Sequence, residues 1–253
     1  EEEIQHPQYR RIDYHGFDPN SLIKQSDFAE KAIKNKKHFC NFLYGNRVPY
    51  REAFFTELSK YKKVDAPGKS MQNMPSLKDD TAIGIWNSKR EYISEYKFTI
   101  AFENYTFPGY HTEKILDPML AGSIPIYIGN PDIEKHFNKN SFIHGRNYMP
   151  DHRKKWLLQI EKAVQPDYED WRPSVYNNPI HRLKRKAKII GRSLKLKYEF
   201  GGGYTGLIEE IKRLDQDDQA YYEMLNQPWY PANTTPDRSR YINQWREIFQ
   251  SVP

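Results

Sequence analysis

The residues best placed to do chemistry lie between positions 96 and 131, where an aromatic loop with one glycine joins two apolar segments. Residues 98–102 are too few for a helix and too apolar for a loop, which predicts a buried strand, and residues 124–128 predict a second one. Between them, apolar residues recur at helical spacing from Thr112 until Gly122. The segment therefore predicts a strand, a loop, a helix and a second strand in succession.

The start of that helix has the composition of an anion site. Thr112 can cap the helix, and Glu113 and Lys114 follow in its first turn. A carboxylate suits the positive end of the helix dipole, but a lysine does not. Lys114 beside unpaired backbone N–H groups would suit a diphosphate. The alternatives are that Lys114 is a solvated surface charge and that Glu113 only favours the dipole.

The segments before this unit predict further alternation of strand and helix. Residues 38–44 and 62–66 read as strands, and a helix opening at Arg51 carries apolar residues at amphipathic spacing. Residues 89–96 read as a short charged helix, and Phe142 with Ile143 as one more strand. This order predicts an α/β fold, in which a Rossmann-like parallel sheet has helices on its faces and right-handed crossovers.

From position 151 the pattern turns helical, and it predicts a helical C-terminal extension. The apolar residues that share helix faces are Trp156, Leu157, Ile160 and Val164 in one group and Leu207, Ile208, Ile211 and Leu214 in another. Residues 215–225 and 239–249 read as further helices. Residues 167–203, with two prolines, a basic run and three consecutive glycines, read as an inserted excursion.

Composition limits the class of protein. The chain has 253 residues, of which 15% are aromatic and 28% charged, so it predicts a folded protein with a well-buried core. Cys40 is the single cysteine, which excludes an internal disulfide and favours a reducing compartment. No apolar run is long enough to span a membrane. We therefore expect a location in the cytoplasm or at the inner face of a membrane. The sequons at Asn104 and Asn233 carry little weight.

The net charge of +6 is concentrated in one run at residues 181–197. This basic run holds eight cations and no acid: Arg182, Lys184, Arg185, Lys186, Lys188, Arg192, Lys195 and Lys197. A solvated helical face and attachment to anionic lipid both explain it, and the second suits a lipid-linked acceptor. Nucleic acid is the weakest explanation, because no nucleic-acid-binding motif is present.

Three blocks of sequence resemble the α1,3/4-fucosyltransferases, glycosyltransferase family 10. They are Phe-Glu-Asn at 102–104, Tyr-His-Thr-Glu-Lys at 110–114 and Ile-Pro-Ile-Tyr-Ile-Gly at 124–129. The likeness extends to Phe-Cys-Asn-Phe at 39–42 and Arg-Glu-Ala-Phe-Phe at 51–55, and it returns in residues 219–231. The resemblance implies the second of two Rossmann-like domains facing a cleft, a GT-B-type domain that holds GDP-fucose.

The resemblance also implies a division of the chain and a reaction. Residues 1–36 would be a linker or the end of a first domain, 37–150 the donor domain, 151–203 the inserted excursion and 204–253 helices packed on the donor domain. The reaction would be inverting transfer of L-fucose from GDP-fucose to a GlcNAc- or glucose-containing glycan, with α1,3 linkage expected. The alternative is a GDP-sugar-binding module or half-enzyme without transferase activity.

By the same resemblance, five residues would hold the donor. Arg51 and Lys114 would bind the diphosphate, Glu113 the ribose, and Tyr110 and Asn104 the phosphate or fucose side. Two fixed cations stabilise the charge that develops as GDP departs, so no metal is required. Taken singly, Arg51 could be a solvated charge, Tyr110 a packed loop aromatic, and Asn104, like Glu103, a residue that only ends a strand.

Two other features bear on catalysis. Asp215-Gln216-Asp217 matches a manganese-binding D-x-D motif, but it falls between two helical segments, where aspartate acts as a cap. The histidines at 111, 136 and 144 have no spacing that suggests a metal site. The family's catalytic glutamate lies in a segment resembling Thr-Gly-Glu-Asn, which is not found in this sequence. The expectation is a chain that begins near the hinge between the two domains, with its general base unidentified.

Overall fold

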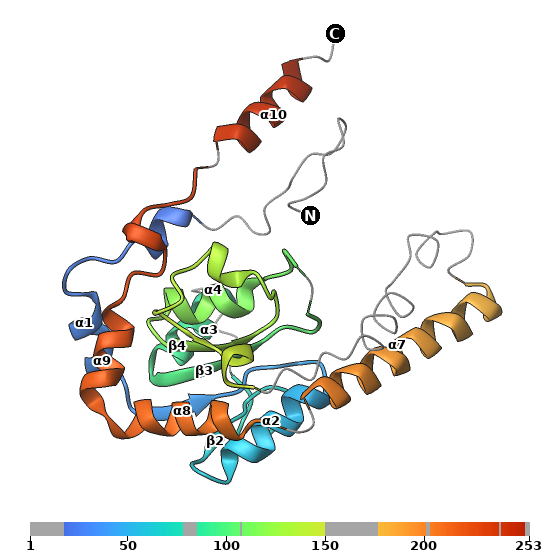
Figure 1. Ribbon diagram of the computed structural model, residues 1–253, viewed down its shortest axis with the longest axis horizontal. Coiled ribbons are helices and arrows are strands. Elements are labelled where there is room, and N and C mark those ends of the chain that lie inside the picture. The colour runs from blue at the N-terminus through green and yellow to red at the C-terminus, as the bar shows by residue number, and fades with distance from the viewer. Residues whose placement is uncertain are drawn as a thin grey trace.

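The computed structural model describes residues 18–77, 85–106, 108–149, 177–200, 203–237 and 239–250. Within them, a five-stranded sheet has the order β2-β1-β3-β4-β5, and every neighbouring pair of strands is parallel. The predicted α/β fold with a parallel sheet is therefore confirmed. This strand order reverses direction between β1 and β3, as in the doubly wound nucleotide-binding folds. The strands and their helices are shown in Figure 1.

The strands are short, and their residues are buried except for His38 in β1, which is exposed, and Lys97 in β3, which is half-buried. Their bounds are β1 His38–Asn41, β2 Val64–Asp65, β3 Tyr96–Phe102, β4 Ile124–Ile128 and β5 Ile143–His144. β3 is longer than its apolar run predicted, because Tyr96 pairs with His38 and extends the ladder. β1 is shorter than predicted, since its pairing with β2 and β3 ends at Asn41.

The helices predicted from the sequence lie close to their predicted positions, whereas those at residues 28–34 and 179–200 fall where no helix was predicted. Those before the basic run are η1 Pro19–Leu22, α1 Phe28–Lys34, α2 Pro49–Ser59, α3 Ile85–Ser94, α4 Glu113–Leu120, η2 Ile133–Lys135 and η3 Gly145–Tyr148. The helix that contains the basic run and those that follow it are α7 Pro179–Phe200, α8 Thr205–Gln216, α9 Asp218–Asn226, η5 Pro231–Asn233 and α10 Ser239–Gln250. The helix predicted around Trp156 lies outside the described residues.

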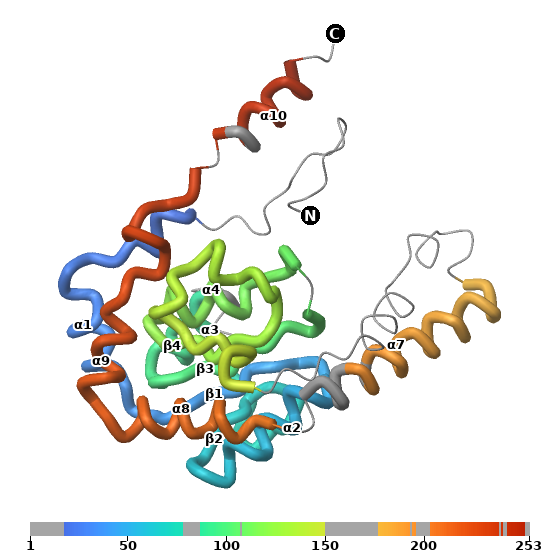
Figure 2. The backbone as a smooth tube through the Cα atoms, in the orientation of Figure 1, coloured from blue at the N-terminus to red at the C-terminus, as the bar shows by residue number. Residues whose placement is uncertain are grey.

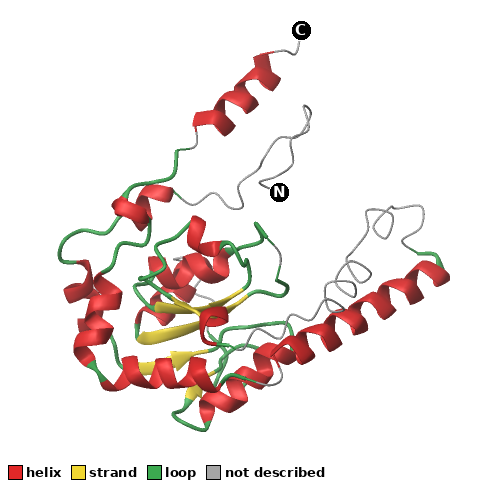
Figure 3. Cartoon of the chain, viewed as in Figure 1, coloured by secondary structure: helices red, strands yellow, loops and turns green. Residues whose placement is uncertain are grey.

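Two phenylalanines on the same face of β3 show which helices cover that face of the sheet. Phe102 stacks on the rings of Tyr50 and Phe54 from α2, and Phe98 meets the edge of Tyr221 from α9. Successive strand side chains point to opposite faces, so this face belongs to α2 and the C-terminal helices. α4 contacts β3 and β4, and α3 packs beside α4 (Figure 3). Gly122 ends α4 with a φ of 67°, the left-handed conformation that favours glycine.

The segment around Lys24 is joined to the C-terminal part of the chain. The Lys24 N–H donates to Oδ1 of Asn233 (3.0 Å), and Nδ2 of Asn233 donates to the Lys24 carbonyl (2.9 Å). The Lys24 ammonium donates to the carbonyls of Leu225 and Gln227 at the end of α9, and it lies 3.3 Å from the centroid of the Trp229 ring. These contacts bring η1 and η5 side by side (Figure 2).

The basic run forms most of α7, which has 22 residues, so the excursion contains a long regular helix. None of the helices in the described part of the chain combines the length and the apolar character needed to cross a bilayer.

Candidate functional site

The candidate site lies where the sheet reverses its strand order. β1 is followed by α2, which carries Arg51, and β3 is followed by Glu103 and Asn104 and then by α4. In doubly wound sheets, ligands bind outside the carboxyl ends of the strands on either side of this reversal. The topology therefore brings residues that are about 50 positions apart to a single edge of the sheet.

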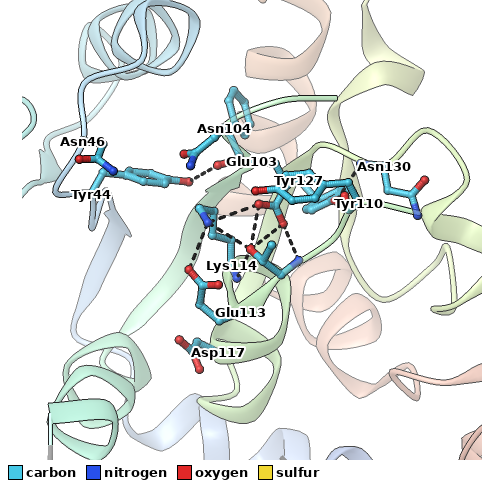
Figure 4. Close-up of polar contacts among 12 residues, drawn as sticks. Tyr44, Asn46, Glu103, Asn104, Tyr110, Glu113, Lys114, Asp117, Tyr127 and Asn130 are labelled. Atoms are coloured by element: carbon cyan, nitrogen blue, oxygen red, sulfur yellow. Dashed lines mark hydrogen bonds and ion pairs between the residues drawn. The ribbon is translucent and has the colours of Figure 1, made fainter. Parts of the chain in front are cut away.

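Lys114 is held by three oxygens at the start of α4. Its ammonium lies 3.1 Å from Oγ1 of Thr112, 3.1 Å from Oε1 of Glu113 and 3.3 Å from Oε2 of Glu103. Thr112 caps the helix as predicted, since its side chain accepts from the Lys114 N–H. Figure 4 shows the ammonium between the two carboxylates. Lys114 therefore has a fixed direction at the positive end of the helix.

Glu103 holds both Thr112 and Lys114 in place. Its side chain has no exposed surface, and it accepts the Thr112 N–H (2.7 Å) and the Thr112 hydroxyl (2.9 and 2.8 Å). Burial raises the pKa of Glu103, while Lys114 and Thr112 act in the opposite direction. The pKa of Glu113 is lowered, because Lys114 and Thr112 outweigh its own desolvation. The two carboxylates on one lysine thus differ in their readiness to hold a proton.

Arg51 is buried, with 1% of its surface exposed, and among the described residues no carboxylate lies within salt-bridge distance of it. Nη1 donates to Oδ1 of Asn104 (2.9 Å) and to the Phe102 carbonyl (3.3 Å), and Nη2 donates to the Asn46 carbonyl (2.9 Å). Its guanidinium lies 3.9 Å from the ring centroid of Tyr44, and its Nε has no hydrogen-bond partner. The direct contacts of this buried cation are therefore neutral oxygens and an aromatic ring.

The aromatic side of the site comes from Tyr110 and the end of β4. The Tyr127 hydroxyl accepts the Asn130 N–H (2.8 Å) and donates to the Tyr110 carbonyl (3.4 Å). Asn130 is buried, and its Oδ1 accepts the N–H groups of Gly109 and Asp132. These bonds fix the loop that carries Tyr110. In Figure 4, Lys114 lies between Tyr44 on one side and Tyr127 with Tyr110 on the other.

The structure bonds four of the five predicted residues to one another in two pairs, Arg51 with Asn104 and Lys114 with Glu113. The carbonyl of Tyr110 is bonded to Tyr127, and Figure 4 shows Tyr110 on the Tyr127 side of Lys114. Sequence reasoning did not identify the role of Glu103, which it treated as a residue that could simply end a strand. The available signal was Gly129: a Cβ there would lie 2.5 Å from Cγ of Glu103, so glycine leaves room for that carboxylate.

The D-x-D motif has a structural role. Asp215 accepts hydrogen bonds from the Tyr61 hydroxyl (3.0 Å) and the Lys62 ammonium (3.0 Å), and it also pairs with Lys97 (3.3 Å). Asp217 caps α9 by accepting the Ala220 N–H (2.9 Å). The predicted capping function is confirmed for Asp217.

The histidines take separate places. The rings of His111 and His136 lie 4.8 Å apart between centroids, whereas Nδ1 of His144 is bonded to Glu134 (2.7 Å). Across the described ranges, no group of three or more His, Cys, Asp or Glu side chains is arranged to hold a metal ion.

Comparison with known proteins points to one family. The model of glycosyltransferase family 10 (fucosyltransferase), C-terminal part, matches residues 29–193. A protein of Acanthamoeba polyphaga mimivirus named as a fucosyltransferase is 41% identical over 155 residues, covering 59% of this chain and 25% of the relative. Alpha-(1,3)-fucosyltransferase FucT of Helicobacter pylori is 31% identical over 153 residues (60% and 30%). Alpha-(1,3)-fucosyltransferase B of Drosophila melanogaster is 40% identical over 164 residues (62% and 36%).

The matched region therefore spans about a quarter to a third of the length of these curated relatives. Solved structures share the fold. A crystal structure of α1,3-fucosyltransferase with GDP-fucose superposes with a TM-score of 0.54 at 20% identity, covering 90% of this chain and 53% of that one. A crystal structure of α1,3-fucosyltransferase with GDP superposes with a TM-score of 0.53 at 21% identity, with the same coverage of both chains. Since the family model matches more than half of the sequence, the chain belongs to glycosyltransferase family 10, the fucosyltransferases, and contains that family's C-terminal region.

Proposed function

We propose that the sheet domain binds GDP-fucose and that the protein is an inverting fucosyltransferase acting on a GlcNAc- or glucose-containing glycan, with α1,3 linkage. The observation that carries the proposal is the pair of cations, Lys114 and Arg51, on either side of the strand-order reversal. Solved relatives contain GDP-fucose and GDP, and two curated relatives are named as α1,3-fucosyltransferases.

The diphosphate would lie against Lys114 at the start of α4. There the ammonium and the positive end of the helix dipole both favour negative charge. Departure of GDP in an in-line displacement leaves charge on the β-phosphate while the fucosyl carbon becomes electron-poor. A fixed cation stabilises that change more than it stabilises the bound donor, which is how electrostatic catalysis lowers a barrier. The proposal assigns this charge stabilisation to protein cations and requires no metal.

Arg51 would bind a phosphate oxygen with the nitrogen that now donates to Asn104. In this conformation its guanidinium has almost no exposed surface, and Asn104 occupies one of its Nη1 hydrogen bonds. A phosphate oxygen reaches Nη1 only if the Asn104 side chain turns aside. We propose that donor binding produces this exchange, with the Asn104 amide then free for the fucose. Glu113, with 23% of its side chain exposed, would receive the ribose hydroxyls, and Tyr110 would contact the phosphate or fucose side.

Calorimetry with GDP, GDP-fucose and GDP-mannose tests the donor site. Lys114→Ala removes a charge-assisted contact of about 1.5–3 kcal/mol, so the Kd for GDP should rise by roughly 10- to 100-fold. Lys186→Ala on α7 is the matched control and should change the Kd by less than about twofold. Equal small effects, or no GDP binding by the unmodified chain, would contradict the donor site. Release of GDP on adding acceptor separates a transferase from a module that only binds the donor.

A second part of the proposal concerns α7. Five of its exposed apolar residues repeat at intervals of three and four, and they are Ile180, Leu183, Ala187, Ile190 and Leu194, while the exposed Ile189 lies off this stripe. Ile180, Leu183 and Leu194 are each more than 60% exposed. The residues that are half-buried against the rest of the molecule are largely cationic, such as Arg185 and Lys188. A helix on a globular protein ordinarily has the reverse arrangement, with its apolar stripe facing the core.

This outward apolar stripe favours an anionic bilayer surface over a merely solvated face. Lys184 and Lys186 are exposed and flank the stripe, so their ammonium groups can reach lipid phosphates while the Ile and Leu side chains enter the acyl boundary. We propose that the protein attaches peripherally to such a surface, near a lipid-linked acceptor. An apolar stripe has no use on nucleic acid, which needs cations and stacking rings.

Sedimentation with vesicles tests the surface. We expect binding to vesicles containing about 30% phosphatidylserine and little binding to phosphatidylcholine vesicles, because each nearby cation contributes roughly 1 kcal/mol on an anionic surface. Leu183→Gln should weaken binding. Phe249→Gln is the matched control, because Phe249 is an exposed apolar residue on α10, away from the basic run. Equal binding to both vesicle types, or equal losses in both variants, would refute membrane attachment through α7.

A further inference from the structure

Three charges meet at the start of α4, and they do not balance. The ammonium of Lys114 is paired with Glu113 at 3.1 Å and with the buried Glu103 at 3.3 Å. With both carboxylates ionised, the group sums to −1. An anion that approaches Lys114 therefore meets an ammonium that is already paired with two carboxylates. The proposed donor brings a diphosphate with two further negative charges to the same place.

Like charges a few ångströms apart disfavour each other's ionisation, most strongly where water is excluded. If the diphosphate draws the Lys114 ammonium toward itself, Glu103 loses its ion-pair partner but stays buried. An unpaired carboxylate without exposed surface is costly, and neutralisation by a proton is the usual relief. The inference rests on the proposed donor site.

We propose that Glu103 takes up one proton from solvent when the diphosphate of GDP-fucose engages Lys114. Glu103 is thus a positioning residue: as a carboxylate it orients Lys114 through the ion pair, and as a neutral acid it leaves the lysine's charge to the donor. The step makes one O–H bond on Oε2 and breaks none in the donor. The local sum of the three protein charges changes from −1 to 0.

The hydrogen bonds around Glu103 can accommodate that proton. Oε2 lies 2.8 Å from Oγ1 of Thr112, which accepts from the Lys114 ammonium at 3.1 Å. When the ammonium turns to a phosphate, that lone pair becomes available to the new O–H of Glu103. The Thr112 N–H and hydroxyl can keep their bonds to Oε1 at 2.7 and 2.9 Å. No buried group is left without a partner.

The proton belongs on Glu103 and not on Glu113. Glu103 has no exposed surface, and burial raises its pKa, whereas Glu113 is 23% exposed and its pKa is lowered. Tyr127 on β4, Tyr50 on α2 and Tyr44 in the loop before it also interact with the Glu103 carboxylate, and the charged Arg51 on α2 acts on Tyr44 and Tyr50. The pKa of each of these tyrosines is raised by burial, so they stay neutral near pH 7 and do not compete for the proton.

Titration calorimetry counts the proton directly. GDP-fucose is injected at pH 7.5 in buffers of different ionisation enthalpy, and the slope of binding enthalpy against ionisation enthalpy gives the number of protons taken up. GDP-fucose is the probe of choice because both of its phosphates are esterified and neither titrates near neutrality. We expect a net uptake approaching one proton, with an affinity that falls by up to tenfold per unit of rising pH. Binding without buffer dependence overturns the inference and leaves the donor site intact. Absence of binding overturns the donor site itself.

Variants locate the proton. Glu103→Gln keeps an oxygen for the Thr112 N–H and cannot titrate, so its donor binding should show no proton uptake and no pH dependence of Kd between pH 6 and 8. Glu113→Gln is the matched control and should retain the uptake. Uptake that persists in Glu103→Gln, or that disappears only in Glu113→Gln, overturns the assignment. If Glu103→Gln fails to fold, the carboxyl ¹³C shift of Glu103 in the unmodified protein decides: a shift to the protonated value on adding GDP-fucose supports the inference, and an unchanged shift refutes it.

Discussion

Replacing Gly129 with alanine places a methyl group in a space that two buried side chains already occupy. Its Cβ would lie 2.3 Å from the Tyr127 hydroxyl oxygen and 2.5 Å from Cγ of Glu103. Neither neighbour can swing into solvent, because both have no exposed surface. The conflict is purely one of space, since Gly129 is not among the residues with a positive φ. The alanine must therefore move Tyr127, Glu103 or the chain itself.

The size of the effect follows from these contacts. Forcing an extra carbon into a packed core costs about 1–3 kcal/mol. Displacing Tyr127 also weakens its bond to the Asn130 N–H (2.8 Å), a loss of about 1 kcal/mol. We therefore expect Gly129→Ala to lower the free energy of unfolding by about 2–4 kcal/mol. Because Glu103 moves with it, donor affinity should fall as well.

Urea unfolding followed by circular dichroism measures this difference, with Gly45→Ala as the matched control. A Cβ at Gly45 would meet no atom within 4 Å, so that substitution should change the free energy of unfolding by no more than about 0.5 kcal/mol. Equal stabilities for the two variants would refute the packing argument. A Gly129→Ala variant that is destabilised but binds GDP-fucose normally would refute the link from Gly129 through Glu103 to Lys114.

Three further predictions concern aspartates. Asp117 is 1% exposed on α4 and pairs with Lys89 (2.8 Å) and Arg90 (3.0 Å). Asp117→Ala should therefore lower the free energy of unfolding in urea by about 3–5 kcal/mol. The control Asp132→Ala removes an exposed ion pair and should lower it by under about 1 kcal/mol. Asp217→Ala removes the cap of α9 and should cost about 1 kcal/mol, with no change in GDP binding on adding Mn²⁺; a manganese-dependent loss would revive the metal site. Burial acts to raise the pKa of Asp215, but its bonds to Lys62 and Tyr61 outweigh burial and the net shift is downward. Its stabilising effect is present above its unfolded pKa and is lost as pH falls through the lower folded value. The stability advantage of the unmodified protein over Asp215→Asn should thus shrink below about pH 3.8, and a constant difference from pH 7 to 2 would contradict this.

The local parts of the fold could be predicted from the sequence. The strands around 98–102 and 124–128, the Thr112 cap and the Gly122 terminus all depend on residues a few positions apart. The ends of elements were less predictable, because pairing partners decide them. Tyr96 reads as the end of a charged helix by its neighbours, yet it joins β3 because it pairs with His38 across the ladder.

The site could be predicted by residue type but not by geometry. Lys114 and Glu113 are adjacent in the sequence, so their pairing is local. Arg51 bonds to Asn104, 53 positions away, and no local pattern shows that its guanidinium is turned inward and stacked on Tyr44. The ion pair between Glu103 and Lys114 likewise depends on the path of the loop that joins β3 to α4. The basic run shows the same limit: its composition predicts an inserted excursion, and only the structure shows that it forms α7 and which face of that helix meets solvent.

The bonds between Lys24 and Asn233 bear on the order in which the protein folds. They connect residues 209 positions apart, and closing a free loop of that length costs roughly 5 kcal/mol of chain entropy. Two hydrogen bonds cannot offset that cost in an open chain, so the contact forms only after the sheet and α9 have brought the two segments together. Trp229, which lies under the Lys24 ammonium, is therefore a reporter of the last stage of folding.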